Sequence, residues 1–163
     1  MAKKRAISKT NAMRELDRIN AEYIQRSFEF TGRETGLEIA HMLNLDPDTV
    51  FKTLVTVGKS GNHYVFMIPV AEELDLKKAA QTVNEKSIHM VKSKELLDLT
   101  GYIHGGCSPL GMKKCFKTTI DETAELFENI AFSGGKQGLQ IETSFENLKR
   151  AIPLEEADLV VDK

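Results

Sequence analysis

The sequence predicts a mixed α/β fold of the α+β kind, in which a curled, barrel-like mixed sheet of six or seven strands is flanked by short helices. Two observations lead to this prediction. Strand-like apolar runs and short helical patterns are interleaved along the chain, and their order is irregular, with hairpins as well as crossovers. The length of 163 residues fits one domain with one core, so we expect a single domain over residues 1–163.

The N-terminal third is predicted to hold a helix, a strand and a second short helix. Apolar residues recur at helical spacing after a candidate cap at Thr10: Met13, Leu16, Ile19 and Tyr23. Residues 23–30, YIQRSFEF, then alternate as a strand does. One face of that strand carries Ile24, Arg26, Phe28 and Phe30. A short helix is expected from residue 37 to 43, and Asp46–Pro47 is typical of the start of another turn.

Two apolar segments in the middle of the chain are predicted to pair as a hairpin. They are residues 51–57, FKTLVTV, and residues 63–70, HYVFMIPV, and the link between them suits antiparallel pairing. Neither segment alternates cleanly, so we expect both faces of the hairpin to be covered. The remaining predicted elements are a helix at 76–83, a strand at 87–91, a helix at 94–99, strands at 117–121, 129–133 and 138–143, and a closing helix at 144–152.

Charge and composition exclude several classes of protein. The net charge of -2 at pH 7 excludes a globally basic nucleic-acid clamp, although local basic patches remain open. Residues 1–26 form one such patch, with seven Lys/Arg against three Asp/Glu, and the KKR at residues 3–5 is interpreted as a solvated tail. Two cysteines are too few for a disulfide scaffold. No segment resembles a signal peptide or a membrane span, so we expect a cytoplasmic protein.

Conventional catalytic and cofactor motifs are not found in the sequence. No two of the four histidines are spaced as i, i+3 or i+4, so neither a metal nor any other cofactor is expected. Residues 106–111 approach the spacing of a phosphate-binding loop, but Met112 stands where that loop needs a lysine. No G-x-S-x-G elbow supports a serine nucleophile. Cys107 is a candidate nucleophile without a recognisable partner, and a buried structural cysteine is favoured.

The segment at residues 100–114, TGYIHGGCSPLGMKK, concentrates glycine in one place. Glycine is costly in regular structure, so either the chain turns tightly there or another group approaches its peptide groups closely. Two further residues leave alternatives open. Lys52 in a doubly covered strand either extends to an edge or points into a pocket. Ser133 precedes Gly134–Gly135, where a turn serine is the simpler interpretation.

Three segments in this order resemble a known family. They are residues 46–54 (DPDTVFKTL), 100–114 (TGYIHGGCSPLGMKK) and 132–142 (FSGGKQGLQIE), with 74–80 (LDLKKAA) between them. The chain resembles the YbaK/EbsC family of free-standing aminoacyl-tRNA deacylases, which are related to the editing domain of bacterial prolyl-tRNA synthetase. The likeness extends from about residue 10 to 160, and the segments are specific in combination.

The resemblance implies an activity and a set of site residues. The implied substrate is Cys-tRNA(Pro), and also Cys-tRNA(Cys), with prolyl-tRNA synthetase as the implied partner. The family's functional positions fall on Lys52, Gly105, Gly106, Ser108, Pro109, Ser133 and Gly134. From these we predict that Lys52, Gly106 and Ser133 are catalytic, that the other four bind substrate, and that Lys113 and Lys114 contact tRNA phosphates.

The sequence departs from the family pattern at two positions. Members typically carry a tyrosine at the position of Phe28, which we also place at the substrate, and an aliphatic residue at the position of Cys107. Phe28 cannot supply a phenolic hydroxyl. The alternatives are therefore a non-catalytic module that binds tRNA or a synthetase on the same fold, and an editor of Ala-tRNA or Ser-tRNA.

Overall fold

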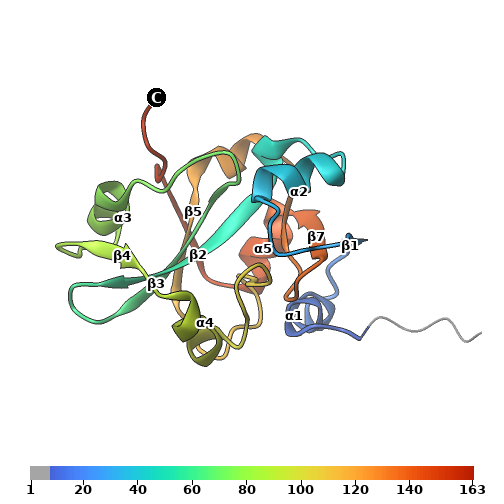
Figure 1. Cartoon of the computed structure of the whole chain (residues 1–163), viewed down its shortest axis with the longest axis horizontal. Helices are drawn as coiled ribbons and strands as arrows, with labels where there is room; N and C mark the ends of the chain where they lie inside the picture. The colour runs from blue at the N-terminus through green and yellow to red at the C-terminus, as the bar shows by residue number, and fades with distance from the viewer. Residues whose placement is uncertain (1–7) are drawn as a thin grey trace, which may run out of the picture.

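The computed structural model describes residues 8–163 (Figure 1). The basic tail at residues 3–5 lies outside the described residues. The helices are α1 (Asn11–Arg18), α2 (Gly36–Met42), α3 (Leu76–Thr82), α4 (Ser93–Thr100) and α5 (Phe145–Ala151), with 3-10 turns η1 (Pro47–Thr49) and η2 (Glu122–Leu126). The strands are β1 (Ile24–Ser27), β2 (Phe51–Gly58), β3 (His63–Pro69), β4 (Ile88–Met90), β5 (Lys117–Asp121), β6 (Asn129–Ser133), β7 (Leu139–Ser144) and β8 (Leu154–Ala157).

A five-stranded mixed sheet forms the larger part of the fold. Its strand order is β4-β2-β3-β5-β8. The predicted hairpin is confirmed, because β2 and β3 pair antiparallel with Phe51 opposite Pro69 and Val57 opposite His63. β4 pairs antiparallel with the end of β2 only, from Thr56 to Gly58. The β3–β5 and β5–β8 pairs are parallel.

A second, three-stranded antiparallel sheet lies beside the first, on the right in Figure 1. Its order is β1-β7-β6, and it packs with α1 and α5. A single parallel bridge between Val50 and Ala131 connects the two sheets. The bridge therefore joins the residue before β2 to the middle of β6, and no further pairing between these two strands follows it.

The main core fills the space between the small sheet and the two helices α1 and α5. Fully buried side chains from the large sheet, such as Phe51 and Ile120, reach into it. A second core lies under α3, where Phe66 and Ile68 of β3 contact Ala79 and Ala80. The predicted caps are confirmed, since the Thr10 and Ser144 hydroxyls accept hydrogen bonds from the first turns of α1 and α5.

Three details differ from the sequence-based prediction. The strands form two sheets and no closed barrel among residues 8–163, so the barrel-like description is not confirmed. The strand predicted for residues 23–30 ends at Ser27. β8 was not predicted, because its sequence LEEA is exposed or half-buried and lacks the apolar alternation of a strand.

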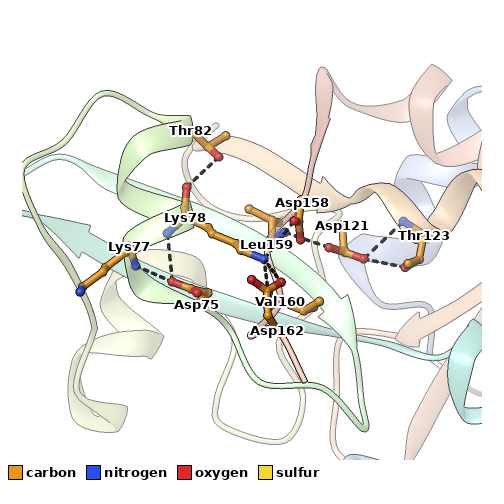
Figure 2. Close-up of polar contacts among 10 residues, drawn as sticks. All are labelled: Asp75, Lys77, Lys78, Thr82, Asp121, Thr123, Asp158, Leu159, Val160 and Asp162. Carbon is orange, nitrogen blue, oxygen red and sulfur yellow. Dashed lines mark hydrogen bonds and ion pairs between the residues drawn. The ribbon is translucent and has the colours of Figure 1, made fainter.

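The C-terminal segment is held against α3 by the ammonium group of Lys78. Figure 2 shows its Nζ donating to Asp158 at 2.9 Å, to Asp162 at 2.7 Å and to the main-chain oxygen of Val160 at 2.8 Å. Asp121 lies in the same region and accepts from the main-chain N–H of Leu159 at 2.9 Å. All three donors of Lys78 have acceptors.

Candidate functional site

A cavity of about 490 Å³ opens where the two sheets diverge from the Val50–Ala131 bridge. Its floor is the edge of β2, residues 51–55, and the ends of β6 and β7 contribute Ser133 and Gln140. The other walls come from the loop before α2, from β4 and α4, and from the glycine loop. Their lining residues are Phe30, Gly32, Arg33, Glu34, Thr35, Gly36, Ile39, Val70, Met90, Val91, Ser93, Leu96, His104, Gly105 and Cys107.

Lys52 lines this cavity and is half-buried. This position agrees with the alternative in which Lys52 lies at a pocket rather than extending to an edge of the sheet. Burial lowers the pKa of its ammonium group, and the carboxylates of Glu73 and Glu72 act against that shift. No salt bridge or hydrogen bond to the Lys52 ammonium is present within residues 8–163. The cavity therefore holds a partly dehydrated cation whose hydrogen-bond donors are available.

The glycines of the loop permit a close approach between two loops. A Cβ on Gly106 would lie 2.8 Å from the main-chain nitrogen of Gln137 and 2.8 Å from the carbonyl carbon of Lys136. Gln137 also donates from Nε2 to the main-chain oxygen of His104 at 2.9 Å. Gly105 adopts a φ of +84°, a left-handed conformation that favours glycine. The glycine loop is thus fixed against residues 136–137.

Gly106 itself does not line the cavity. Its main-chain N–H donates to the oxygen of Ile103 at 2.9 Å, so this amide is engaged in a turn. Ser108 and Pro109 are buried and do not line the cavity, and the Ser108 hydroxyl accepts a hydrogen bond from Leu110 N–H at 3.3 Å. Of the predicted loop positions, only Gly105 is placed at the cavity.

Ser133 faces the cavity at the end of β6, across from Gln140 on β7. Its hydroxyl accepts a hydrogen bond from the main-chain N–H of Gly135 at 3.3 Å, so it also makes the turn contact that the simpler interpretation expected. Gly134 packs away from the cavity, where a Cβ would lie 2.7 Å from Leu139 Cγ.

The two aromatic residues after β1 take different positions. Phe30 lines the cavity, whereas Phe28 does not. Phe28 donates its main-chain N–H to the oxygen of Gly138 at 2.9 Å, and its ring meets that of Phe30 edge to face, with 6.2 Å between centroids. The alternating pattern placed both on one face but could not show which one reaches the site.

Cys107 lines the cavity as a buried thiol. Burial raises its pKa to about 11, and a hydrogen bond with Thr100 acts slightly in the other direction. The thiol is therefore protonated near neutral pH and is a poor nucleophile. Lys113 and Lys114 are exposed and lie outside the cavity lining.

The wall that the sequence did not indicate is formed by the loop before α2 and the first turn of that helix. Thr35 and Glu38 form a capping box there, and Glu34 accepts hydrogen bonds from Thr31. A T-x-x-E pattern signals a helix start but gives no hint of a cavity wall, which depends on the tertiary fold.

Within residues 8–163, no group of three or more His, Cys, Asp or Glu side chains is placed to hold a metal ion. None of the described helices is long and apolar enough to cross a membrane.

Comparison with known proteins gives a consistent result. The model of the family described as "Aminoacyl-tRNA editing domain" matches residues 33–151. The chain is 44% identical over 149 residues to a protein of Enterococcus faecalis named "Putative Cys-tRNA(Pro)/Cys-tRNA(Cys) deacylase EbsC", and the match covers 90% of each chain. Both matches include the β2 edge, the glycine loop and Ser133.

Two further likenesses are more distant. A protein of Kosmotoga olearia named "Proline--tRNA ligase" is 28% identical over 110 residues, which is 68% of this chain but 19% of that longer one. A solved structure described as a "putative trans-editing enzyme for prolyl tRNA synthetase" superposes with a TM-score of 0.78 at 22% identity. It covers 95% of this chain and 100% of that one, so it shares the fold over nearly the whole length.

Proposed function

We propose that this chain, which belongs to the aminoacyl-tRNA editing domain family, is a free-standing deacylase that clears Cys-tRNA(Pro) and Cys-tRNA(Cys) in the cytoplasm. One observation carries the proposal: Lys52, half-buried and without an ion-pair or hydrogen-bond partner among residues 8–163, lines an open cavity within the matched region. At about 490 Å³ the cavity has the size of a small-molecule site, which ranges over roughly 300–1,000 Å³. The likeness to EbsC over 90% of each chain supports cysteine as the amino acid.

The reaction uses the substrate's own thiol as the nucleophile. The thiolate sulfur bonds to the carbonyl carbon of its own ester, the bond from that carbon to the 3′-terminal ribose oxygen breaks, and a four-membered thiolactone leaves. The proton lost by the thiol is returned to the ribose oxygen. Holding the cysteine in the reactive pose supplies a high effective molarity. The protonation state of Cys107 supports this route, because the thiol of this lining residue is protonated near neutral pH and is therefore a poor nucleophile.

The predicted site residues receive roles that agree with their positions. Lys52 stabilises the ribose alkoxide as it leaves or holds the terminal phosphate. Ser133 positions the ester and the 2′-hydroxyl from the opposite wall. Gly105 brings main chain to the cavity, and Gly106, Ser108, Pro109 and Gly134 fix the two loops that carry it. Phe28 supports Phe30 at the mouth, and Lys113 and Lys114 contact tRNA phosphates outside.

The sharpest test compares four substrates: Cys-tRNA, S-alkylated Cys-tRNA, Ser-tRNA and Ala-tRNA. We expect Cys-tRNA to be cleared far faster than the others, because only it offers a thiolate. Equal rates on free and alkylated Cys-tRNA would remove the substrate thiol from the reaction. Faster clearance of Ala-tRNA or Ser-tRNA would establish a different editor. Binding without cleavage of any ester would establish the non-catalytic alternative.

Prolyl-tRNA synthetase is proposed as the partner that supplies tRNA selectivity. The chain has a net charge of -2, and the exposed Lys113 and Lys114 are its main basic contribution beside the glycine loop. Few phosphate contacts give weak binding with a shallow dependence on salt. Tight, sequence-selective tRNA binding by the chain alone at physiological salt would contradict this part of the proposal.

A further inference from the structure

The cavity floor is an open strand edge, and we propose that the main chain of Thr53 in β2 binds the aminoacyl group as a one-residue strand. In this arrangement the Thr53 carbonyl accepts a hydrogen bond from the substrate's α-ammonium, and the Thr53 N–H donates to the ester carbonyl. The inference rests on the proposed function and adds to it a requirement for a free α-amino group on the substrate.

The hydrogen bonds around β2 fix the direction of the Thr53 main chain. Val70 N–H donates to Val50 O at 2.8 Å, so the even-numbered residues of β2 face β3. Val91 N–H donates to Val55 O at 3.1 Å on the other side. Because main-chain direction alternates along a strand, the N–H and C=O groups of Thr53 also point away from β3.

No strand occupies that side of Thr53. β4 pairs with β2 only from Thr56 onward, and the bridge to β6 is formed at Val50. The gap between these two contacts is the cavity, which residues 51–55 line. Within residues 8–163, Thr53 takes part in no strand pairing or bridge on this side. Its side-chain oxygen is likewise buried without a partner.

An α-amino ester is well suited to this edge. Its ammonium and its carbonyl are attached to one carbon, as the N–H and C=O groups of a peptide residue are. A residue of a neighbouring antiparallel strand pairs with two hydrogen bonds through those same groups, and added strands are a common mode of recognition at open edges. The Thr53 N–H would then also stabilise the oxyanion that forms when the thiolate attacks.

The test uses wild-type protein with Cys-tRNA and with 3-mercaptopropionyl-tRNA, which keeps the thiol and the ester but lacks the α-amino group. Each enzymatic rate is divided by the spontaneous rate of the same ester in buffer, because the ammonium also activates the ester chemically. We expect kcat/KM for the analogue to be about 10- to 100-fold lower, since a hydrogen bond to a charged group is lost. Equal normalised rates would overturn the inference while leaving the proposed function intact. Failure to clear Cys-tRNA would count against the proposed function instead.

A proline variant tests the main chain directly. Thr53→Pro removes the N–H that faces the cavity, so we expect Cys-tRNA clearance to fall about 100-fold or more. Ser27→Pro is the matched control. Phe28 N–H donates to Gly138 O, so by alternation the Ser27 N–H faces outward from the edge strand β1, away from the cavity lining. Clearance by a folded Thr53→Pro protein at the Ser27→Pro rate would overturn the inference. If Thr53→Pro does not fold by circular dichroism, the substrate comparison decides.

Discussion

Two lysines in this protein have opposite surroundings. Lys78 donates to two carboxylates and a carbonyl at the C-terminal segment, and these contacts, led by Asp162 and then Asp158, raise its pKa. Lys52 has no such acceptor among residues 8–163, and burial lowers its pKa. A side chain whose donors are all used ties chain segments together, whereas one left unpaired in a cavity is available to a ligand. The following predictions test this difference between the C-terminal clamp and the cavity.

The largest expected effects come from replacing each of the two lysines with alanine: Lys52→Ala should lower kcat, and Lys78→Ala should lower Tm. Lys52→Ala removes a charge next to the leaving oxygen, which we expect to cost about 3–4 kcal/mol of transition-state stabilisation, or about 100- to 1,000-fold in kcat. Lys78→Ala should lower Tm and leave kcat within about threefold of wild type at a temperature where it is folded. Measurement of Tm and kcat for both variants separates the two roles. Turnover by Lys52→Ala within threefold of wild type would remove Lys52 from the site.

Gly106→Ala tests whether the cavity depends on the contact between the two loops. The new Cβ would lie 2.8 Å from main-chain atoms of Lys136 and Gln137, and such overpacking costs about 1–3 kcal/mol of unfolding free energy. We expect kcat to fall as well, because the loop carrying Gly105 moves. Gly61→Ala is the control: Gly61 has a φ of +93° but open space around it, so it should lose stability and keep its kcat. Unchanged stability of Gly106→Ala would contradict the close approach.

The pH dependence of activity should reflect the lowered pKa of Lys52. Clearance rises as the substrate thiol ionises near pH 8.5, and it falls as Lys52 loses its proton below the usual lysine pKa of 10.5. Lys52→Arg, if active, should keep its charge and move the alkaline limb upward. Initial rates from pH 6 to 10, corrected for spontaneous hydrolysis, give the profile. An alkaline limb that is the same in both proteins would assign it to another group.

The stability of the two regions should respond to alkaline pH in opposite directions. The folded-state pKa of Lys52 is lowered, so the unfolded chain binds more protons between that pKa and 10.5, and the free energy of unfolding rises with pH in this window. The folded-state pKa of Lys78 is raised, so its stabilisation is complete below 10.5 and is lost as pH rises through the raised pKa. Denaturant titrations of Lys52→Met and Lys78→Met against wild type, from pH 8 upward, measure both slopes. Parallel pH profiles for all three proteins would show that neither lysine contributes as described.

A smaller effect is expected at Cys107. Its thiol has a pKa of about 11, so Cys107→Ala should leave clearance of Cys-tRNA within about threefold of wild type. Brief treatment of the folded protein with iodoacetamide should modify the exposed Cys115 and spare the buried Cys107. Mass spectrometry of peptides gives the modified position. Loss of activity in Cys107→Ala would move the nucleophile onto the protein.

The smallest expected effect is at Phe28. Phe28→Tyr adds a hydroxyl to a half-buried ring outside the cavity lining, so stability should change by less than about 0.5 kcal/mol. Phe30→Ala is the contrasting variant, because Phe30 lines the cavity and its loss should weaken substrate binding. Thermal melts and KM for Cys-tRNA report the two results. Severe destabilisation by Phe28→Tyr would show that Phe28 is core.

Local sequence patterns were sufficient for much of the fold. The hairpin of β2 and β3 followed from two apolar runs with a short link, and the caps at Thr10 and Ser144 followed from residue types that accept hydrogen bonds at helix starts. The two separate sheets did not follow, because strand partners far apart in sequence are set by tertiary packing. β8 was missed since its pairing with β5 compensates for a sequence without apolar alternation.

The candidate site was predictable only in part, and for a physical reason. Lys52 stood out as a charge inside an apolar run, and the structure places it at the cavity together with Ser133. The glycine loop was visible as a cluster, but the sequence cannot show that Gly106 packs against residues 136–137 while Gly105 faces the cavity. The open edge at Thr53 gave no signal at all, since it is a property of main-chain pairing and independent of side-chain type.

The pairing of β1 with β7 has a consequence for how the protein is made on the ribosome. Arg26 of β1 forms an ion pair with Glu142 of β7, 116 residues later in the chain. At about 5–20 residues per second, translation would take roughly 6–23 s to cover that distance, during which β1 has no partner. The hairpin of β2 and β3 has all of its residues by Pro69 and can form long before then. Of the residues that line the cavity, all but Ser133 and Gln140 are therefore made by Cys107, and the binding site is complete only when these two residues of β6 and β7 have been added.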